Sequence, residues 1–231
     1  QALPDEPLIF IEVALTRGMS ATVQPLLDPQ SPVVSPDDAD CAMFYSITNC
    51  QAGLRGISFG NFLIKQVAED LGREFPRMRT FATLSPIPGF RQWLESSGAL
   101  AAAGAGVNAL VQGFDRDGWP AASAIRPDAR NALCRLCADY LLHAKKGKAP
   151  LDSVARFHLA NGARLERLNW AGDTSDVGLR RSLGLTVNYV YRLEDVERNH
   201  EAYAKDYRIV ASREFDRLAR QSSCADPAKS R

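Results

Sequence analysis

The first residues with a pattern that could carry chemistry form a glycine-bearing turn at positions 51–60, with the sequence QAGLRGISFG. The turn lies between an apolar stretch that predicts a strand and an amphipathic stretch that predicts a helix. Small residues there let backbone N–H groups converge on an anion at the helix N-terminus, where the helix dipole also favours negative charge. The spacing fits neither the dinucleotide fingerprint nor the nucleotide-triphosphate loop. The residues alone leave two interpretations open: a phosphate site, with Arg55 as a mobile cation, or a turn without a ligand.

Cysteine, histidine and serine positions offer further candidates, each with an ordinary structural alternative. Cys134 and Cys137 have the spacing of a metal or redox pair. No second pair stands at ligand spacing, and the surrounding apolar pattern is helical, so we expect core residues and no metal. His158, whose imidazole would ordinarily titrate near roughly pH 6.5, is either a general acid or a satisfied core histidine. Ser85 precedes a proline, where a turn-stabilising serine is the commonest case.

The composition narrows the class of protein. The chain has 231 residues, of which 45% are hydrophobic, as in an ordinary globular protein. Its 28 Lys and Arg nearly balance 27 Asp and Glu, so no global field favours nucleic acid or an anionic membrane. No apolar run is long enough to span a bilayer. Five scattered cysteines favour a reducing compartment over a disulfide framework, and a cytoplasmic location is the default expectation.

Strand and helix patterns alternate irregularly along the chain, which predicts a mixed α/β fold around one sheet. The predicted strands are residues 8–15, 41–48, 80–84, 163–170 and 183–191. The predicted helices are residues 61–74, 131–143 and 152–161, one short helix within 96–124, and one or two charged helices in 193–221. Residues 25–40, rich in Pro, Ser and Asp, predict a surface loop.

Two stretches resemble motifs of GNAT-type acyltransferases. Residues 55–60, RGISFG, are similar to the R/Q-x-x-G-x-G/A signature that wraps the pyrophosphate of coenzyme A, with Ser58 in place of the first glycine. Residues 157–163, FHLANGA, are similar to a later helix-to-strand signature of that fold, with His158 where many members have a tyrosine. This resemblance implies a GNAT-like fold with a central, mostly antiparallel mixed sheet flanked by helices.

Longer stretches resemble the malonyl-CoA decarboxylase family. They are residues 44–65 (FYSITNCQAGLRGISFGNFLIK), residues 84–90 (LSPIPGF) with Trp93 following, residues 154–163 (VARFHLANGA) and, more weakly, residues 188–191 (NYVY). The resemblance implies one GNAT-like catalytic domain over residues 1–231, with a core at 1–192 and a helical extension at 193–231. It also implies that the family's N-terminal helical oligomerisation domain is absent from this chain, and that the full-length protein is a homo-oligomer.

The resemblance assigns roles to particular residues. It implies Ser85 and His158 as catalytic residues. It implies substrate contacts from Ser46, Ser58 and Tyr191, and coenzyme A contacts from Gln51, Gly53, Arg55, Gly56, Ser58 and Gly60. The position of Ser58 can be acidic in family members, so serine there departs from the pattern.

The implied reaction converts malonyl-CoA to acetyl-CoA and carbon dioxide without a cofactor, because the thioester carbonyl accepts the electron pair. Ser85 would orient the carboxylate and His158 would protonate the α-carbon. Backbone N–H groups at the end of the strand 41–48 would stabilise the enolate oxygen. Three alternatives stay open: an acyl-CoA-dependent acyltransferase, a Ser-His thioester hydrolase, which lacks the G-x-S-x-G elbow here, and a non-catalytic malonyl-CoA sensor.

Overall fold

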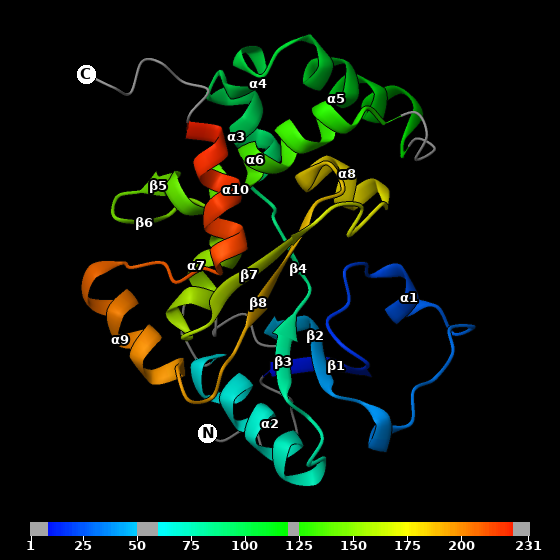
Figure 1. Ribbon diagram of the computed structural model, residues 1–231, viewed down its shortest axis with the longest axis vertical. Coiled ribbons are helices and arrows are strands. Elements are labelled where there is room, and N and C mark those ends of the chain that lie inside the picture. Colours follow the sequence, from blue (N-terminus) through cyan, green and yellow to red (C-terminus); the bar gives the residue numbers. More distant parts are fainter. Residues whose placement is uncertain (1–8, 50–59, 120–124, 224–231) are drawn as a thin grey trace, which may run out of the picture.

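The computed structural model describes residues 9–49, 60–119 and 125–223, and it is built around one six-stranded sheet (Figure 1). The strands follow the order β1-β2-β3-β8-β4, and β7 pairs with β8. These strands are β1 (Ile9–Thr16), β2 (Cys41–Asn49), β3 (Thr80–Thr83), β4 (Ser85–Pro86), β7 (Arg164–Asn169) and β8 (Thr186–Val190). A separate hairpin consists of β5 (Lys145–Lys146) and β6 (Ala149–Pro150).

Helices cover the sheet and extend the molecule beyond one end of it. They are α1 (Gln24–Leu27), α2 (Gly60–Glu74), α3 (Phe90–Ser96), α4 (Ala99–Ala102), α5 (Ala105–Asp117), α6 (Pro127–His143), α7 (Ser153–Ala160), α8 (Asp176–Ser182), α9 (Val196–Asp206) and α10 (Arg213–Ser223), with a 3₁₀ turn η1 (Pro36–Asp38). Figure 1 shows α3, α4, α5 and α6 gathered at one end and α2 beside β1–β3 at the other, with β7 and β8 running between them.

Only the β2–β3 pair of the described sheet is parallel, which confirms the predicted mixed, mostly antiparallel sheet. The parallel register ends at Phe44 and Thr83, after which the Leu84 N–H donates to the Phe44 carbonyl at 3.0 Å. The chain then enters β4, which pairs with β8, whereas β2 continues beside β1 alone. The two parallel strands therefore separate beyond Leu84.

The core lies on both sides of β8, whose five residues are all buried. Apolar residues of α6 recur at helical spacing, so that Leu133, Cys137 and Leu141 all face this core. The helix prediction for this segment is confirmed, with a start at Pro127 that precedes the predicted one. Proline at the first helical position explains the earlier start, because it has no N–H to leave unsatisfied.

The prediction of one short helix within residues 96–124 is wrong. The structure has α4 there and the 13-residue helix α5, in which Val107, Val111 and Phe114 are buried at intervals of four and three. Ala and Gly dilute this pattern in the sequence, so packing rather than propensity stabilises the helix. The sequence prediction also missed α3, α8 and the β5–β6 hairpin, and placed a loop where α1 and η1 form short turns.

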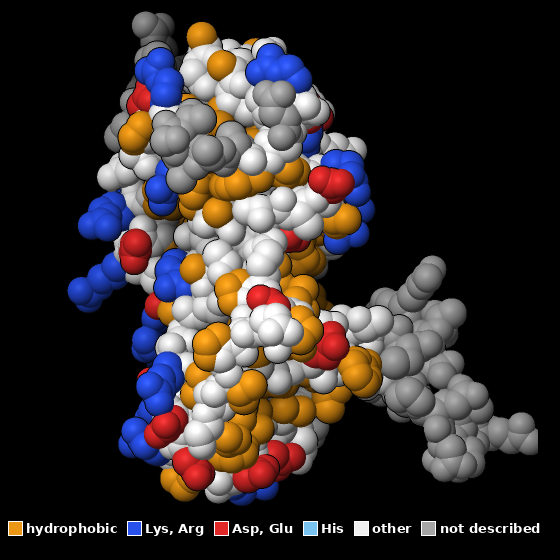
Figure 2. All heavy atoms as spheres, turned by 90° about the vertical axis from the view of Figure 1, so that its right-hand side faces the viewer, with side chains coloured by type: hydrophobic (Ala, Val, Ile, Leu, Met, Phe, Trp, Pro, Cys, Tyr) orange, Lys and Arg blue, Asp and Glu red, His pale blue; other side chains and the backbone are white. Residues whose placement is uncertain are grey.

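Burial decreases towards the edge strand β1, in which no residue is fully buried and Phe10 is 55% exposed. Figure 2, which faces the right-hand side of Figure 1, shows hydrophobic side chains spread over the lower half of the molecule. Among the described helices, none is both long enough and apolar enough to cross a membrane.

Gly162, which follows α7, tests how tightly the end of that helix is packed. Its φ is +79°, and a Cβ there would lie 2.1 Å from the Val196 carbonyl oxygen. Gly162→Ala should therefore lower the free energy of unfolding by about 3 kcal/mol, from backbone strain and overpacking together. Gly98 has the same φ of +79° and open space around it, so Gly98→Ala should cost only about 1 kcal/mol. Equal losses in urea unfolding would contradict the contact with Val196.

Candidate active site

Helix α7 carries His158, and a side-chain cap determines where this helix begins. The Asp152 carboxylate accepts from the backbone N–H groups of Val154 and Ala155, both at 2.9 Å. This is the capping expected for an aspartate at a helix N-terminus. The helix ends at Ala160, shortly before Gly162, so His158 lies in its last turn, where it is 4% exposed.

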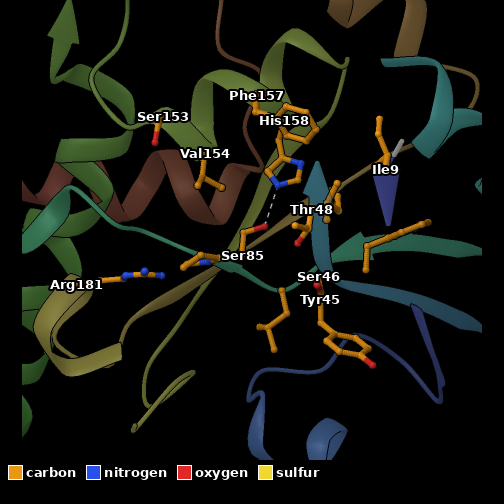
Figure 3. A pocket seen from close by; sticks show the side chains of 14 residues that line it. Ile9, Tyr45, Ser46, Thr48, Ser85, Ser153, Val154, Phe157, His158 and Arg181 are labelled. Carbon is orange, nitrogen blue, oxygen red and sulfur yellow. Dashed lines mark hydrogen bonds between the residues drawn. The ribbon is translucent and has the colours of Figure 1, made fainter. Parts of the chain in front are cut away.

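Ser85 and His158 meet at the sheet although they are 73 positions apart in the sequence. The Ser85 Oγ lies 3.0 Å from His158 Nε2, and Figure 3 shows the two side chains pointing at each other. Ser85 is 4% exposed and belongs to β4, so it is not a turn-capping serine. Its hydroxyl also donates to Thr83 Oγ1 at 2.7 Å. The structure thus brings the two predicted catalytic residues into direct contact.

The second ring nitrogen of His158 contacts Tyr191. The Tyr191 hydroxyl lies 2.8 Å from Nδ1, and the Tyr189 ring stacks on the imidazole with centroids 4.5 Å apart. Burial lowers the pKa of His158 from its ordinary value near 6.5 to about 3. The imidazole is therefore neutral at pH 7, with one nitrogen donating a hydrogen bond and the other accepting one.

Two residues of strand β8 hydrogen-bond to Thr83 and so support the Ser85–His158 contact. The Tyr189 N–H donates to Thr83 Oγ1 at 3.2 Å, and Asn188 Nδ2 donates to the Thr83 carbonyl at 2.7 Å. Sequence reasoning missed Thr83 and Tyr189. The alternation of side chains along a strand places Tyr189 on the same face as Tyr191, which is the signal that could have identified it.

A cavity of about 540 Å³ opens beside the Ser85–His158 pair. It is lined by Ile9, Phe44, Tyr45, Ser46, Ile47, Thr48, Leu84, Ser85, Pro86, Ser153, Val154, Phe157, His158 and Arg181. Ser46 thus lies on the cavity wall, as predicted for a substrate contact. Tyr191 is not among these residues, and its hydroxyl reaches the site through the imidazole.

The backbone of β2 forms one wall of this cavity. A register shift opposite Glu12 and Val13 leaves Tyr45 as an extra residue between Phe44 and Ser46, which is the signature of a β-bulge. Beyond Phe44, the edge of β2 that had paired with β3 has no strand partner in the described sheet. Backbone groups along this edge can therefore serve a ligand, and the oxyanion hole at the end of this strand stays a prediction.

The predicted coenzyme A turn is mostly outside the described residues. This applies to Gln51, Gly53, Arg55, Gly56 and Ser58, so their roles stay predictions. Gly60 is the first residue of α2, and β2 ends at Asn49, which confirms that the turn connects a strand to a helix.

Asp152 also ties the SPIPG segment to α7. The second oxygen of its carboxylate lies 3.4 Å from the Tyr140 hydroxyl and 3.5 Å from the Gly89 N–H, and burial raises the pKa of this carboxyl. A Cβ at Gly89 would lie 2.4 Å from the Tyr140 hydroxyl oxygen, so only glycine fits there without displacement. The segment after Ser85 and the helix of His158 thus share one buried anchor.

The cysteine pair lies away from this site, on α6. Cys137 is buried in the core and Cys134 is half-buried, and burial raises the pKa of the Cys134 thiol to about 11. Within the described part of the chain, no group of three or more His, Cys, Asp or Glu side chains could hold a metal ion.

Comparisons with known proteins find one family. A family profile described as malonyl-CoA decarboxylase C-terminal domain matches residues 1–228. The mitochondrial malonyl-CoA decarboxylase of Anser anser anser is 38% identical over 236 aligned positions, covering 91% of this chain and 46% of that protein.

Solved structures of relatives show the same similarity. The malonyl-CoA decarboxylase of Rhodopseudomonas palustris is 47% identical with a TM-score of 0.86, covering 94% of this chain and 50% of that one. The enzyme of Agrobacterium vitis is 45% identical with a TM-score of 0.85, covering 94% of this chain and 54% of that one. The chain thus spans about half the length of these relatives.

The low pKa of His158 predicts a dependence of stability on pH. The unfolded chain binds a proton at this histidine below about pH 6.5, whereas the folded protein does so only near pH 3. Stability is therefore lost as the pH falls from 6.5 towards 3, by about 2 kcal/mol at pH 5. Urea unfolding of the wild type and of His158→Gln at pH 7 and pH 5 measures this contribution as a difference between the two proteins. An identical pH dependence in both would contradict a neutral buried His158.

Proposed function

This chain belongs to the malonyl-CoA decarboxylase family, matching its C-terminal domain, and we propose that it converts malonyl-CoA to acetyl-CoA and carbon dioxide. The observation that carries the proposal is the buried contact of 3.0 Å between Ser85 and His158, at a cavity bounded by the open edge of β2. We expect no cofactor in this reaction. That the full-length protein is a homo-oligomer and acts in the cytoplasm stays a prediction.

In the proposed reaction, the bond between the α-carbon and the carboxylate carbon breaks, and its electron pair passes into the thioester as an enolate. Carbon dioxide leaves, and one proton is taken up at the α-carbon to give acetyl-CoA. The enolate oxygen needs preorganised donors, and one such donor is typically worth about 10²–10³ in rate. Backbone groups at the bulge of β2, with the Ser46 hydroxyl beside them, are the proposed donors.

Ser85 is proposed to hold the substrate carboxylate so that the breaking bond lies perpendicular to the enolate plane. In the described structure this hydroxyl donates to Thr83 Oγ1, so it must turn from Thr83 towards the cavity to donate to the substrate carboxylate. The wall around it includes Leu84, Val154 and Phe157. A carboxylate placed there loses much of its hydration, which favours its departure as neutral carbon dioxide.

His158 is proposed to supply the proton. When the Tyr191 hydroxyl donates to Nδ1, the ring proton lies on Nε2, which faces Ser85 and the cavity. An anionic substrate close to the imidazole raises the pKa of His158, because the opposite charge favours the protonated ring. Substrate binding would thus favour uptake by His158 of the proton that the reaction later consumes.

The Ser85–His158 contact also favours a second candidate, a thioester hydrolase with Ser85 as nucleophile, because a serine and a histidine at this distance form the core of such a pair. Against it, Nδ1 contacts a tyrosine hydroxyl where hydrolases commonly have a carboxylate. The products distinguish the two: a hydrolase releases free coenzyme A, and a decarboxylase releases acetyl-CoA.

Incubating the purified protein with malonyl-CoA alone should yield acetyl-CoA and carbon dioxide in equal amounts. Ser85→Ala and His158→Ala should each lower kcat by about 10²-fold or more, because each removes a group proposed to contact the substrate. Ser96→Ala and His143→Ala, at exposed positions outside the cavity lining, are the matched controls and should retain activity. Free coenzyme A as the main product, or unchanged turnover in both site variants, would overturn the proposal.

Tyr191→Phe tests the contact behind the imidazole. The variant keeps the ring and removes the hydroxyl that lies 2.8 Å from Nδ1, so kcat should fall roughly tenfold with little change in KM. The control is Tyr203→Phe, which removes the hydroxyl of another buried tyrosine residue, away from the cavity. Equal effects of the two substitutions would assign Tyr191 to packing alone.

A further inference from the structure

Arg181 stands apart from the other residues of the cavity wall. It is the only Lys, Arg, Asp or Glu among the described residues that line the cavity. The remaining wall is apolar or neutral, with serine and threonine hydroxyls. A positive charge at this position is therefore the strongest attraction that the described wall offers to an anionic group.

The side chain of Arg181 is available to a ligand. It is exposed, and no salt bridge within the described residues involves it. Arg180 and Arg181 both lie in the last turn of α8, where a cation stabilises the helix dipole. Arg180 is also exposed but does not line the cavity, so the helix dipole alone does not account for the position of Arg181.

Arg181 lies at the end of the cavity where we expect the acyl group of a bound thioester. Figure 3 shows Ser46 and Thr48 on one side of Ser85 and Arg181 on the other, with the Arg181 side chain extending from α8 towards Ser85. The predicted coenzyme A turn follows directly after β2, so a thioester bound there would approach along Thr48 and Ser46. Its acyl group would then pass Ser85 and His158 and point towards Arg181.

We propose that Arg181 binds the carboxylate of the acyl group and thereby selects a malonyl thioester over an acetyl thioester; this inference rests on the proposed function. A guanidinium matches a carboxylate by two parallel hydrogen bonds. The contact exists only before carbon dioxide leaves, because acetyl-CoA has no carboxylate. Arg181 therefore contributes to substrate binding and not to the transition state, and its loss of contact favours product release.

The test compares two ligands and three variants of the purified protein. Arg181→Gln should raise KM for malonyl-CoA roughly ten- to hundredfold, the range expected for a hydrogen bond to a charged group, without lowering kcat. The inhibition constant of acetyl-CoA should stay unchanged. Arg181→Lys should retain part of the effect through its charge, and Arg180→Gln should behave as the wild type.

Each other outcome overturns the inference. Equal weakening of both ligands would assign Arg181 to the coenzyme A moiety, and no change in either would assign it to the end of α8. A lower kcat at constant KM would mean that Arg181 acts on the transition state. If the wild type does not turn over malonyl-CoA, the proposed function fails separately, and calorimetric affinities of wild type and Arg181→Gln for both thioesters still decide the role of Arg181.

Discussion

The separation of β2 from β3 is the constraint on which the site depends. The two strands pair in parallel for only four residue pairs, from Cys41 with Thr80 to Phe44 with Thr83. Had the ladder continued, it would have occupied the edge of β2 that now lines the cavity. Because the chain instead turns at Leu84 and pairs with β8, Ser85 is placed opposite that edge and below α7. The separation of the two strands thus creates the cavity, exposes backbone polar groups of β2 to it and positions the Ser85 hydroxyl beside it.

Burying polar side chains in such a space is costly unless they bond to one another. Thr83, Ser85, His158 and Tyr191 meet this requirement as one continuous line of contacts. By contrast, the Tyr189 hydroxyl and the side-chain amide of Asn161 have no hydrogen-bond partner among the described residues. The hydrogen-bonded set is the one that reaches the cavity, through Ser85 and His158. A neutral imidazole within it avoids the large penalty of an unpaired buried charge.

The sequence was informative where a pattern was local. The apolar run 41–48 and the helical pattern at 152–161 correctly located β2 and α7, and the SPIPG and FHL motifs pointed to Ser85 and His158, which the structure places in contact. Local patterns could not show that these two residues touch, because the contact depends on pairing between β4 and β8, which are distant in sequence. The protonation state of His158 likewise follows from burial by surrounding elements. Arg181 was missed since nothing distinguishes it from Arg180 until α8 is placed beside the cavity.

The contacts of α9 link it to the end of α7, the helix that carries His158. Asn199 donates to the Gly162 carbonyl at 3.1 Å and His200 donates to the Ala160 carbonyl at 2.6 Å, so α9 supplies donors to carbonyl groups at and just beyond the end of α7. Further along, Ser212 donates to the Glu166 carbonyl of β7 at 2.7 Å. The described residues 193–223 thus supply hydrogen-bond donors to both α7 and β7. Without α9, the Ala160 and Gly162 carbonyls at the end of the helix that carries His158 would lose these donors.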